Sequence, residues 1–278
     1  MLTSLYVETI KKESLLDRFI CKLRRDKIRT YVKQASGISI RCVEYVSYSG
    51  KVNFIRLDRI IGAQRNRLLC DKSIELPKDM GYKRFDDSAY KERLCTNLAL
   101  TLLKSVENSH ISVGIIDMDA QFTTLPQDVL SYTDNVVVVT ACDDIYKEVS
   151  QQLIEETGAI IRLSKSFESL NKCELVIAPS GVQRYVASAD TVLLTTRKSS
   201  DYVNVEAVSD YTVKLPKMLL ELCPKGIDAT YFAGALYLCQ GVFELGSLIP
   251  RLCISKYTVH TVASLKILLS DISSKNLT

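Results

Sequence analysis

The middle of this 278-residue sequence lacks glycine, since none occurs between Gly114 and Gly158. A loop that wraps its backbone around a phosphate needs glycines for tight turning and close approach, so the sequence predicts no such loop here. Cys-x-x-Cys pairs are also missing, although nine cysteines occur, at positions 21, 42, 70, 95, 142, 173, 223, 239 and 253. Free buried thiols in a reducing compartment are the simplest interpretation, and we expect no metal site.

The pattern predicts neither a secretory leader nor a membrane span. Charged residues interrupt the apolar core that a leader would need, at Glu8, Lys11, Lys12 and Glu13. The most apolar long stretch, 231–249, contains Gln240 and Glu244 and is typical of buried helices rather than of a span. These absences predict a soluble cytoplasmic protein that does not enter a membrane.

Charge is unevenly distributed between the two parts of the chain. Residues 1–110 carry 22 Lys and Arg against 13 Asp and Glu, a balance of +9, whereas residues 111–278 carry 14 against 19, a balance of −5. The two values sum to the net +4 of the whole chain. A basic part and an acidic part indicate two units with different surroundings, or two units that face each other.

Five short apolar runs follow one another between residues 112 and 196. They are expected as strands at 113–117, 136–140, 159–163, 174–178 and 191–195. Runs this short and apolar favour strands buried on both faces, as in a parallel sheet. Helices fit between them at 125–132, 144–156, 167–171 and 183–188, with Thr124 and Asp143 as caps of the first two.

The segment before this ladder predicts an α+β unit. A strand is expected at 5–10, a helix at 14–34 that stops at Gly37, and a hairpin that joins 38–42 to 52–57. The stripe of Leu94, Leu98 and Leu102 predicts a helix over 89–105. After about Ser209 the pattern returns to helix, with Asp228 as a cap, Gly241 as an end and a last helix over 259–269 that places His260 in its first turn.

The ladder resembles a known fold family. The passage Leu153-Ile154-Glu155-Glu156-Thr157-Gly158-Ala159-Ile160, within 136–163, is similar to the helix-glycine-strand passage of shikimate dehydrogenases and amino-acid dehydrogenases. A helix that leads into the ladder, as 89–105 does, is another likeness to those enzymes. The resemblance implies an α/β fold with a parallel Rossmann-like sheet, preceded by the α+β domain and followed by C-terminal helices. The expected domains are 1–108, 109–205 and 206–278, and the last could pack on either or both of the others.

The sequence departs from that family where the cofactor would bind. Met118 to Thr124 stands in place of the glycine-rich turn, and Asp117 and Asp119 bring negative charge to the position of an anionic pyrophosphate. A helix N-terminus would favour an anion there, but the carboxylates oppose it. We therefore expect no cofactor, and in particular no dinucleotide in its usual pose.

The same carboxylates also resemble a different family. Ile115-Ile116-Asp117-Met118-Asp119 is similar to the first motif of haloacid-dehalogenase-type phosphatases, and Val137–Thr140 to their second motif. That resemblance implies Asp117 as nucleophile, Asp119 as general acid and base, and magnesium at the phosphate. Pro179-Ser180-Gly181 stands where that family has its metal-binding acidic motif, which counts against this alternative.

Polar residues gather at the carboxyl ends of the predicted strands, where open α/β sheets bind ligands. The candidate ligand-binding residues are Asp117, Asp119, Thr140, Asp143, Ser180, Gly181 and Thr196, with Cys142 and Thr195 beside them. Polar residues also collect wherever buried strands emerge into loops, so each position has this plain explanation too. No complete catalytic arrangement of nucleophile, base and orienting group is present, and no catalytic residue is assigned.

A basic stretch runs from Lys22 to Arg29, with Arg56, Arg59, Arg65 and Arg67 later. It could contact phosphate or nucleic acid, but its helical spacing favours a solvated helix face, so nucleic acid is not the expected partner. The acidic second unit, in the same chain or in a second copy, is the other candidate. The sequence thus predicts a binding, regulatory or scaffolding role without catalysis. An atypical NAD(P)-dependent oxidoreductase and a magnesium-dependent phosphatase are the alternatives.

Overall fold

A computed structural model of the chain describes residues 2–10, 24–106, 111–240 and 248–276. The chain forms two compact units, one of residues 1–87 with 215–246 and the other of residues 88–214 with 247–278. The C-terminal part is therefore shared between the units. The three-domain division expected from the sequence remains a prediction.

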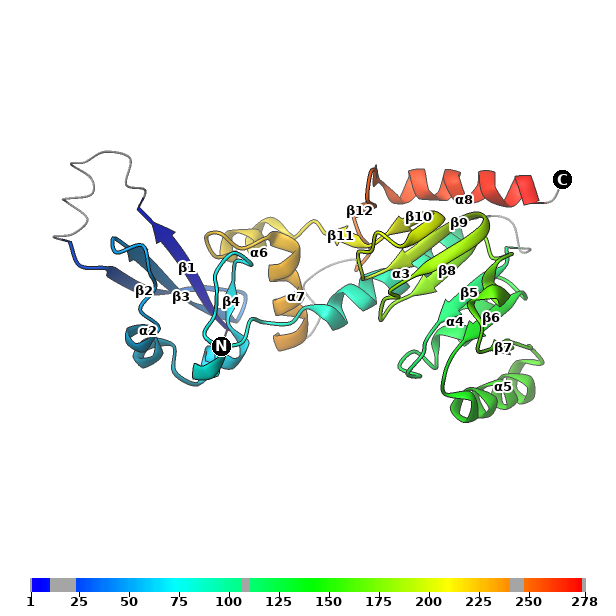
Figure 1. Cartoon of the computed structure of the whole chain (residues 1–278), viewed down its shortest axis with the longest axis horizontal. Helices are drawn as coiled ribbons and strands as arrows, with labels where there is room; N and C mark the ends of the chain where they lie inside the picture. Colours follow the sequence, from blue (N-terminus) through cyan, green and yellow to red (C-terminus); the bar gives the residue numbers. More distant parts are fainter. Residues whose placement is uncertain (1, 11–23, 107–110, 241–247, 277–278) are drawn as a thin grey trace. The chain divides into compact units, whose positions relative to one another are not determined.

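The first unit is built on a four-stranded sheet in the order β2-β3-β1-β4 (Figure 1). The strands are β1 (Leu2–Thr9), β2 (Lys27–Ala35), β3 (Ile38–Ser47) and β4 (Leu69–Cys70). β1 runs parallel to both β3 and β4, whereas β2 pairs antiparallel with β3 and forms one edge. A two-residue turn joins β2 to β3 through Ser36 and Gly37, which both have the positive φ that a type I′ hairpin turn requires.

Three sequence predictions in this unit are wrong. Residues 27–35 form β2 rather than the end of a helix, and 14–23 lie outside the described residues. Gly37 belongs to the hairpin turn and does not stop a helix. Residues 54–61 form helix α2 (Phe54–Ile61) instead of a strand, because the Asn53 side chain accepts a hydrogen bond from the Arg56 N–H and caps the first turn.

Short helices complete the first unit. The 3₁₀ helices η1 (Gly62–Arg67) and η2 (Lys78–Met80) follow α2, and α6 (Lys217–Leu222) and α7 (Ala229–Gln240) come from the C-terminal part. One core packs α2 against β1 and β3 through Leu5, Tyr45, Leu57 and Ile61. The predicted Asp228 cap is confirmed, since its carboxylate accepts the N–H groups of Thr230 and Tyr231. The predicted helix end at Gly241 lies outside the described residues.

The second unit contains the predicted ladder as a six-stranded parallel sheet. Its strands are β5 (Val113–Ile116), β6 (Val136–Val139), β7 (Arg162–Ser164), β8 (Leu175–Ala178), β9 (Tyr185–Thr195) and β10 (Tyr202–Val208). They lie in the order β10-β9-β8-β5-β6-β7, and every neighbouring pair is parallel. Numbered from β5, this order is 6-5-4-1-2-3, the strand order of the Rossmann fold. The predicted α/β class with a Rossmann-like sheet is confirmed.

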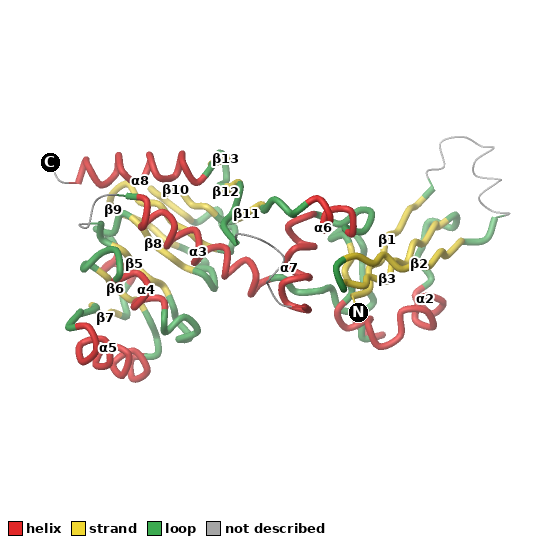
Figure 2. The backbone as a smooth tube through the Cα atoms, turned by 180° about the vertical axis from the view of Figure 1, so that it is seen from behind, coloured by secondary structure: helices red, strands yellow, loops and turns green. Residues whose placement is uncertain are grey.

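The helices of this unit lie near the predicted positions (Figure 2). They are α3 (Ser88–Ser105), α4 (Leu125–Leu130), α5 (Asp143–Thr157) and the 3₁₀ helix η3 (Phe167–Leu170). Thr124 takes the predicted N-cap position of α4, although its side chain makes no capping hydrogen bond. The predicted cap of α5 is wrong, because the N-cap of this helix is Cys142 and not Asp143. Asp143 lies instead in the first turn of α5, where its negative charge interacts favourably with the positive end of the helix dipole.

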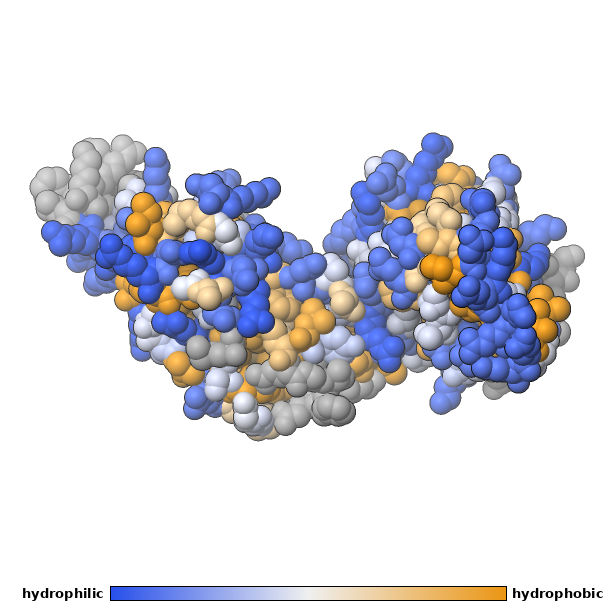
Figure 3. Space-filling model, turned by 90° about the horizontal axis from the view of Figure 1, so that it is seen from below, coloured by the Kyte–Doolittle hydropathy of each residue, from blue (hydrophilic) through white to orange (hydrophobic). Residues whose placement is uncertain are grey.

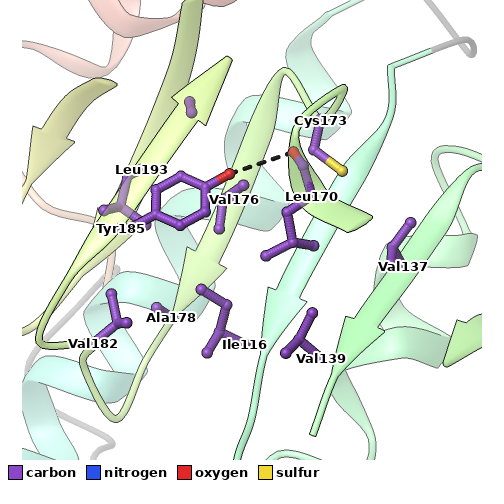
Figure 4. Close-up of a cluster of buried hydrophobic side chains, with 11 residues drawn as sticks. Ile116, Val137, Val139, Leu170, Cys173, Val176, Ala178, Val182, Tyr185 and Leu193 are labelled. Carbon is purple, nitrogen blue, oxygen red and sulfur yellow. Dashed lines mark hydrogen bonds between the residues drawn. The ribbon is translucent and has the colours of Figure 1, made fainter. Parts of the chain in front are cut away.

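The helix predicted at 183–188 is absent, and this segment is extended. Short loops, 179–184 and 196–201, connect β8 to β9 and β9 to β10. Val182, Tyr185 and Ala187 join the core beside Val176 and Leu193. Figure 4 shows the Tyr185 ring among these side chains, where its hydroxyl donates a hydrogen bond to the Leu170 carbonyl (3.3 Å). This extended segment thus packs on the sheet in the place of a crossover helix.

A small antiparallel sheet and a last helix close the second unit. The strands β11 (Asp210–Thr212), β12 (Leu252–Ile254) and β13 (Val259–His260) precede α8 (Val262–Asn276). His260 therefore lies in a strand and not in the predicted helix, and its Nε2 lies 2.8 Å from Glu206 Oε1. Figure 3 shows one face of the molecule, where hydrophilic side chains prevail and smaller hydrophobic areas lie between them.

Candidate functional site

The candidate site is the edge of the six-stranded sheet where its strands end. The strand order reverses between β5 and β8, which are neighbours with Ile115 opposite Ile177. Ligands of open α/β folds bind outside the carboxyl ends of the strands at such a reversal. The segment 117–124 follows β5 and the segment 179–184 follows β8, so both reach this edge.

Asp117 follows β5 and is turned into the protein. Its side chain is buried, with 1% exposed, and three donors surround the carboxylate. Oδ1 accepts the N–H of Gln121 (2.9 Å), and Oδ2 accepts the N–H of Phe122 (2.7 Å) and the hydroxyl of Tyr146 (2.7 Å). A buried carboxylate with this many donors is stabilised as part of the fold. These contacts count against its use as a phosphatase nucleophile, which must reach its substrate.

The loop after β5 closes on this carboxylate. Asp119 and Met118 are exposed, and Ala120 adopts a positive φ of 52°. The backbone N–H groups of residues 121 and 122 point at Asp117. In a dinucleotide site, N–H groups of the corresponding turn point at phosphate oxygens. Here a carboxylate of the chain takes the donors that an anionic ligand would need.

Tyr146 completes this arrangement from helix α5. Its side chain is fully buried, and burial together with the hydrogen bond to Asp117 raises its pKa well above the usual value. The phenol therefore remains protonated and donates to the carboxylate. Sequence analysis missed Tyr146 because nothing in the local pattern of α5 indicates a partner 29 positions earlier.

The residues that follow β6 form a second group. Thr140 is fully buried, and its Oγ1 accepts the N–H of Cys142 (3.0 Å). The thiol of Cys142 lies 3.4 Å from the Met118 carbonyl, which joins the loops after β5 and β6. Asp143 pairs with Lys165, at 2.7 Å between Oδ2 and Nζ. Thr140 is thus engaged within the fold, whereas Asp143 is partly exposed.

The residues that follow β8 and β9 form a third group. The N–H of Gly181 donates to the Ala178 carbonyl (2.9 Å) and closes a turn over Pro179 and Ser180. Thr196 Oγ1 donates to the Pro179 carbonyl (2.6 Å), which fixes the turn to the end of β9. Gly181 has a φ of 83°, and a Cβ there would lie 2.7 Å from the Cβ of Arg197. The sequence therefore needs glycine at this position.

The structure brings Ser180, Gly181 and Thr196 together and leaves Ser180 exposed at the edge. Asp117 and Thr140 are withdrawn into the fold, and Asp119 reaches solvent. Arg197, exposed beside Gly181, is a cation of this edge that sequence analysis missed. Its place two residues after the end of the predicted strand 191–195 was the available signal.

The described residues also bear on two other kinds of site, a metal centre and a membrane span. No group of three or more His, Cys, Asp and Glu side chains in the described ranges is arranged to hold a metal ion. Among the helices that the structure describes, none is long and apolar enough to cross a membrane. The eight cysteines in these ranges are free, and burial raises the pKa of Cys173 to about 12. Cys142 is only partly exposed.

Comparison of the sequence with protein-family models and with curated proteins gives no match. Among solved structures, the chain is similar to Δ1-pyrroline-2-carboxylate reductase of Thermococcus litoralis in complex with NADH and L-proline, with 11% identity and a TM-score of 0.26. The match covers 66% of this chain and 44% of that one. An archaeal alanine dehydrogenase dimer with bound NAD has 12% identity and a TM-score of 0.27, over 67% of this chain and 65% of that one.

L-tryptophan dehydrogenase from Nostoc punctiforme is also similar, with 12% identity and a TM-score of 0.32, over 85% of this chain and 73% of that one. The chain thus spans less than two thirds of the first two proteins. At this distance the likeness concerns the Rossmann-like fold alone. It does not extend to chemistry.

Proposed function

We propose that the Rossmann-like unit binds a small molecule at the carboxyl edge of its sheet, next to Ser180 and Gly181, in a binding, regulatory or scaffolding role without catalysis. The observation that carries the proposal is the position of Asp117, whose carboxylate accepts the N–H groups of Gln121 and Phe122. These donors are the ones that a pyrophosphate would use in this fold. A ligand of this edge therefore binds through other groups, and Ser180 is exposed at this edge.

A second candidate function is that of an atypical NAD(P)-dependent oxidoreductase. The order of the six strands favours it, because this order creates the crevice between β5 and β8 in which dinucleotides bind. For this function the loop at 117–122 would have to release its N–H groups from Asp117. Breaking a buried, charge-assisted network of this kind costs several kcal/mol, on the order of 1.5–3 for each hydrogen bond. The first candidate needs no such rearrangement.

Calorimetric titration with NAD⁺, NADH, NADP⁺ and NADPH separates the two candidates. Binding of any of these with a Kd in the micromolar range supports the oxidoreductase and overturns the proposal that the edge excludes a dinucleotide. For the small-molecule site, thermal shifts are measured with a metabolite library on the native chain and on Ser180→Tyr, which fills the edge. Ser131→Tyr is the matched control, since Ser131 is exposed after α4, where the chain turns toward the start of β6.

A compound whose shift disappears in Ser180→Tyr and persists in Ser131→Tyr supports a ligand at this edge. Equal loss in both variants, or equal retention in both, means that the compound binds elsewhere. If no compound of the library shifts the native chain, the proposed small-molecule role is rejected for the classes tested.

A further inference from the structure

The first unit contains a groove that is distinct from the sheet edge described above. We call it the basic groove, and its volume is about 870 Å³. Its lining residues come from the segment before β2 and the first residues of β2, from β3 and from α2: Arg24, Arg25, Asp26, Lys27, Ile28, Arg29, Glu44, Val46 and Arg56. All five of its cationic side chains are exposed to solvent.

The two carboxylates of the basic groove are occupied by donors of the protein. Asp26 accepts the Tyr45 hydroxyl (2.5 Å) and the N–H groups of Tyr48 (2.8 Å) and Ser49 (3.2 Å). Burial opposes the charge of Asp26, but these hydrogen bonds outweigh it and lower its pKa. Glu44 accepts the hydroxyl of Tyr31 (2.9 Å). Their hydrogen-bonding capacity is thus directed largely into the fold.

The cations are not neutralised in the same way. Within the ranges that the structure describes, none of the five forms an ion pair with a carboxylate. Arg24 and Arg29 lie over the rings of Tyr48 and Tyr31, with 5.8 and 5.5 Å to the ring centroids. Arg56 donates to the backbone carbonyl of Asp26 (2.9 Å). Five positive charges against two negative ones leave the groove with a formal excess of three.

The structure also removes the reason for treating this stretch as a solvated helix face. Residues 27–29 begin an edge strand, and Arg56 from α2 is brought to the same groove across 27 positions of sequence. Four of the five cations are arginines, whose planar guanidinium groups bind phosphate oxygens with two parallel hydrogen bonds. Because they line one groove and form no ion pair with a carboxylate of the described residues, they match a ligand with repeated phosphates better than a single anion.

We propose that the basic groove binds the phosphate backbone of a nucleic acid, without reading its sequence. The arginines contact the phosphates, and no ordered base-reading element is required. Tyr31 and Tyr48 hold Arg29 and Arg24 in place through their rings, which leaves the guanidinium edges for the ligand. The binding is electrostatic, so it weakens steeply as salt is added.

Fluorescence anisotropy with labelled single-stranded RNA, single-stranded DNA and duplex DNA of mixed sequence tests the proposal on the full chain. A salt titration is measured for the native chain, for Arg29→Gln and for Arg25→Gln. Each substitution is expected to weaken binding several-fold and to reduce the slope of log K against log salt by about 0.7 for a single strand or about 0.9 for a duplex. Comparison of the affinities for the three nucleic acids shows which form is preferred.

Arg67→Gln is the matched control, because Arg67 is an exposed arginine of the same unit that does not line the groove. It should keep both the affinity and the slope of the native chain. Circular dichroism and thermal melting of each variant show that a loss of binding is not a loss of folding. A slope that falls equally in Arg67→Gln and Arg29→Gln would reject the groove as the site.

Two further outcomes would overturn the proposal. One is the absence of salt-dependent binding to all three nucleic acids at low ionic strength. The other is binding to anionic phosphatidylserine vesicles, or to poly-glutamate, with an affinity equal to that for nucleic acid, since the groove would then accept polyanions of any kind. The proposal is supported if nucleic acid binds more strongly than both competitors and the groove variants bind it several-fold more weakly.

Discussion

The hydroxyl of Tyr146 donates a hydrogen bond to Asp117, with 2.7 Å between the phenolic oxygen and Oδ2. Both side chains are buried, and the bond joins helix α5 to the loop that follows β5. The loop and the helix lie at the edge of the sheet where a dinucleotide fold receives its ligand. This contact fixes the loop in the conformation that turns its N–H groups toward Asp117.

Replacing Tyr146 with Phe should lower the free energy of unfolding by about 1.5–3 kcal/mol, because it removes a donor from a buried charged acceptor. The measurement is the urea midpoint followed by circular dichroism. Tyr132→Phe is the control, since Tyr132 is 36% exposed and its loss should change stability by less than about 0.5 kcal/mol. Equal effects of the two substitutions would contradict the structural role of the Tyr146 hydroxyl.

The two carboxylates of the Asp117-Met118-Asp119 segment should respond differently to the same change. Asp117→Asn removes a charged acceptor of three hydrogen bonds and should destabilise the protein by about 1–3 kcal/mol, whereas Asp119→Asn at an exposed position should be nearly neutral. Hydrogen exchange at the amides of Gln121 and Phe122 checks the cause. Both amides should exchange faster in Asp117→Asn and at the native rate in Asp119→Asn.

The sequence predicts the ladder well because burial on both faces requires consecutive apolar residues. Val113–Ile116 and Val136–Val139 are buried at every position, so their pattern is unambiguous and too short for a helix. The strand predicted at 159–163 begins three residues later and ends one residue later, at Arg162–Ser164, because β7 is an edge strand with an exposed first residue. An edge strand gives little apolar signal of its own.

Weak apolar patterns also explain two wrong predictions, the helix expected over β2 and the helix expected at 183–188. β2 is an edge strand whose residues are all exposed or partly buried, so its few apolar side chains fit a helix and a strand equally well. The segment 183–188, predicted as a crossover helix, is extended instead, and Val182, Tyr185 and Ala187 pack onto the sheet from this extended chain. Tertiary contacts determine the secondary structure of such segments, and the local sequence pattern carries no information about those contacts.

The sequence predicts the location of the candidate site at the edge of the sheet, but it does not predict the side-chain contacts within the site. Residues at the ends of parallel strands meet at one edge by topology, which is why Ser180, Gly181 and Thr196 lie together. Whether a carboxylate faces outward or inward depends on donors elsewhere in the chain. For Asp117 these are two amides of its own loop and a tyrosine of a distant helix.

Replacement by Ala should destabilise the protein more at Gly181 than at Gly158, although both glycines have a positive φ. Gly181→Ala places a Cβ 2.7 Å from that of Arg197, whereas Gly158→Ala at the end of α5 meets no atom within 4 Å. Both variants carry the left-handed backbone cost of about 1–2 kcal/mol, and only Gly181→Ala adds a clash of about 1–3 kcal/mol. Urea midpoints of both variants measure the difference. Equal destabilisation would mean that the turn moves away from Arg197 without cost.

Stability should fall as the pH rises above 10. Burial, together with the negative charge of Asp58, raises the pKa of Tyr82 to about 12, and its side chain is 1% exposed. In the unfolded chain a tyrosine loses its proton near pH 10, while the folded chain retains it. The unfolded state then binds fewer protons than the folded state, so the free energy of unfolding decreases with pH. The contribution is fully present below pH 10 and is lost as the pH approaches 12.

Urea midpoints between pH 8 and pH 11.5 (about the range over which the effect develops) measure this loss, with a slope of at most about 1.4 kcal/mol per pH unit for each such tyrosine. Tyr82→Phe should make the decline shallower than in the native chain, because the variant has no proton to lose at this position. Tyr257→Phe is the control, since Tyr257 is 85% exposed and should leave the decline unchanged. If Tyr82→Phe declines as steeply as the native chain, titration of the buried Tyr82 is not a cause of the alkaline loss.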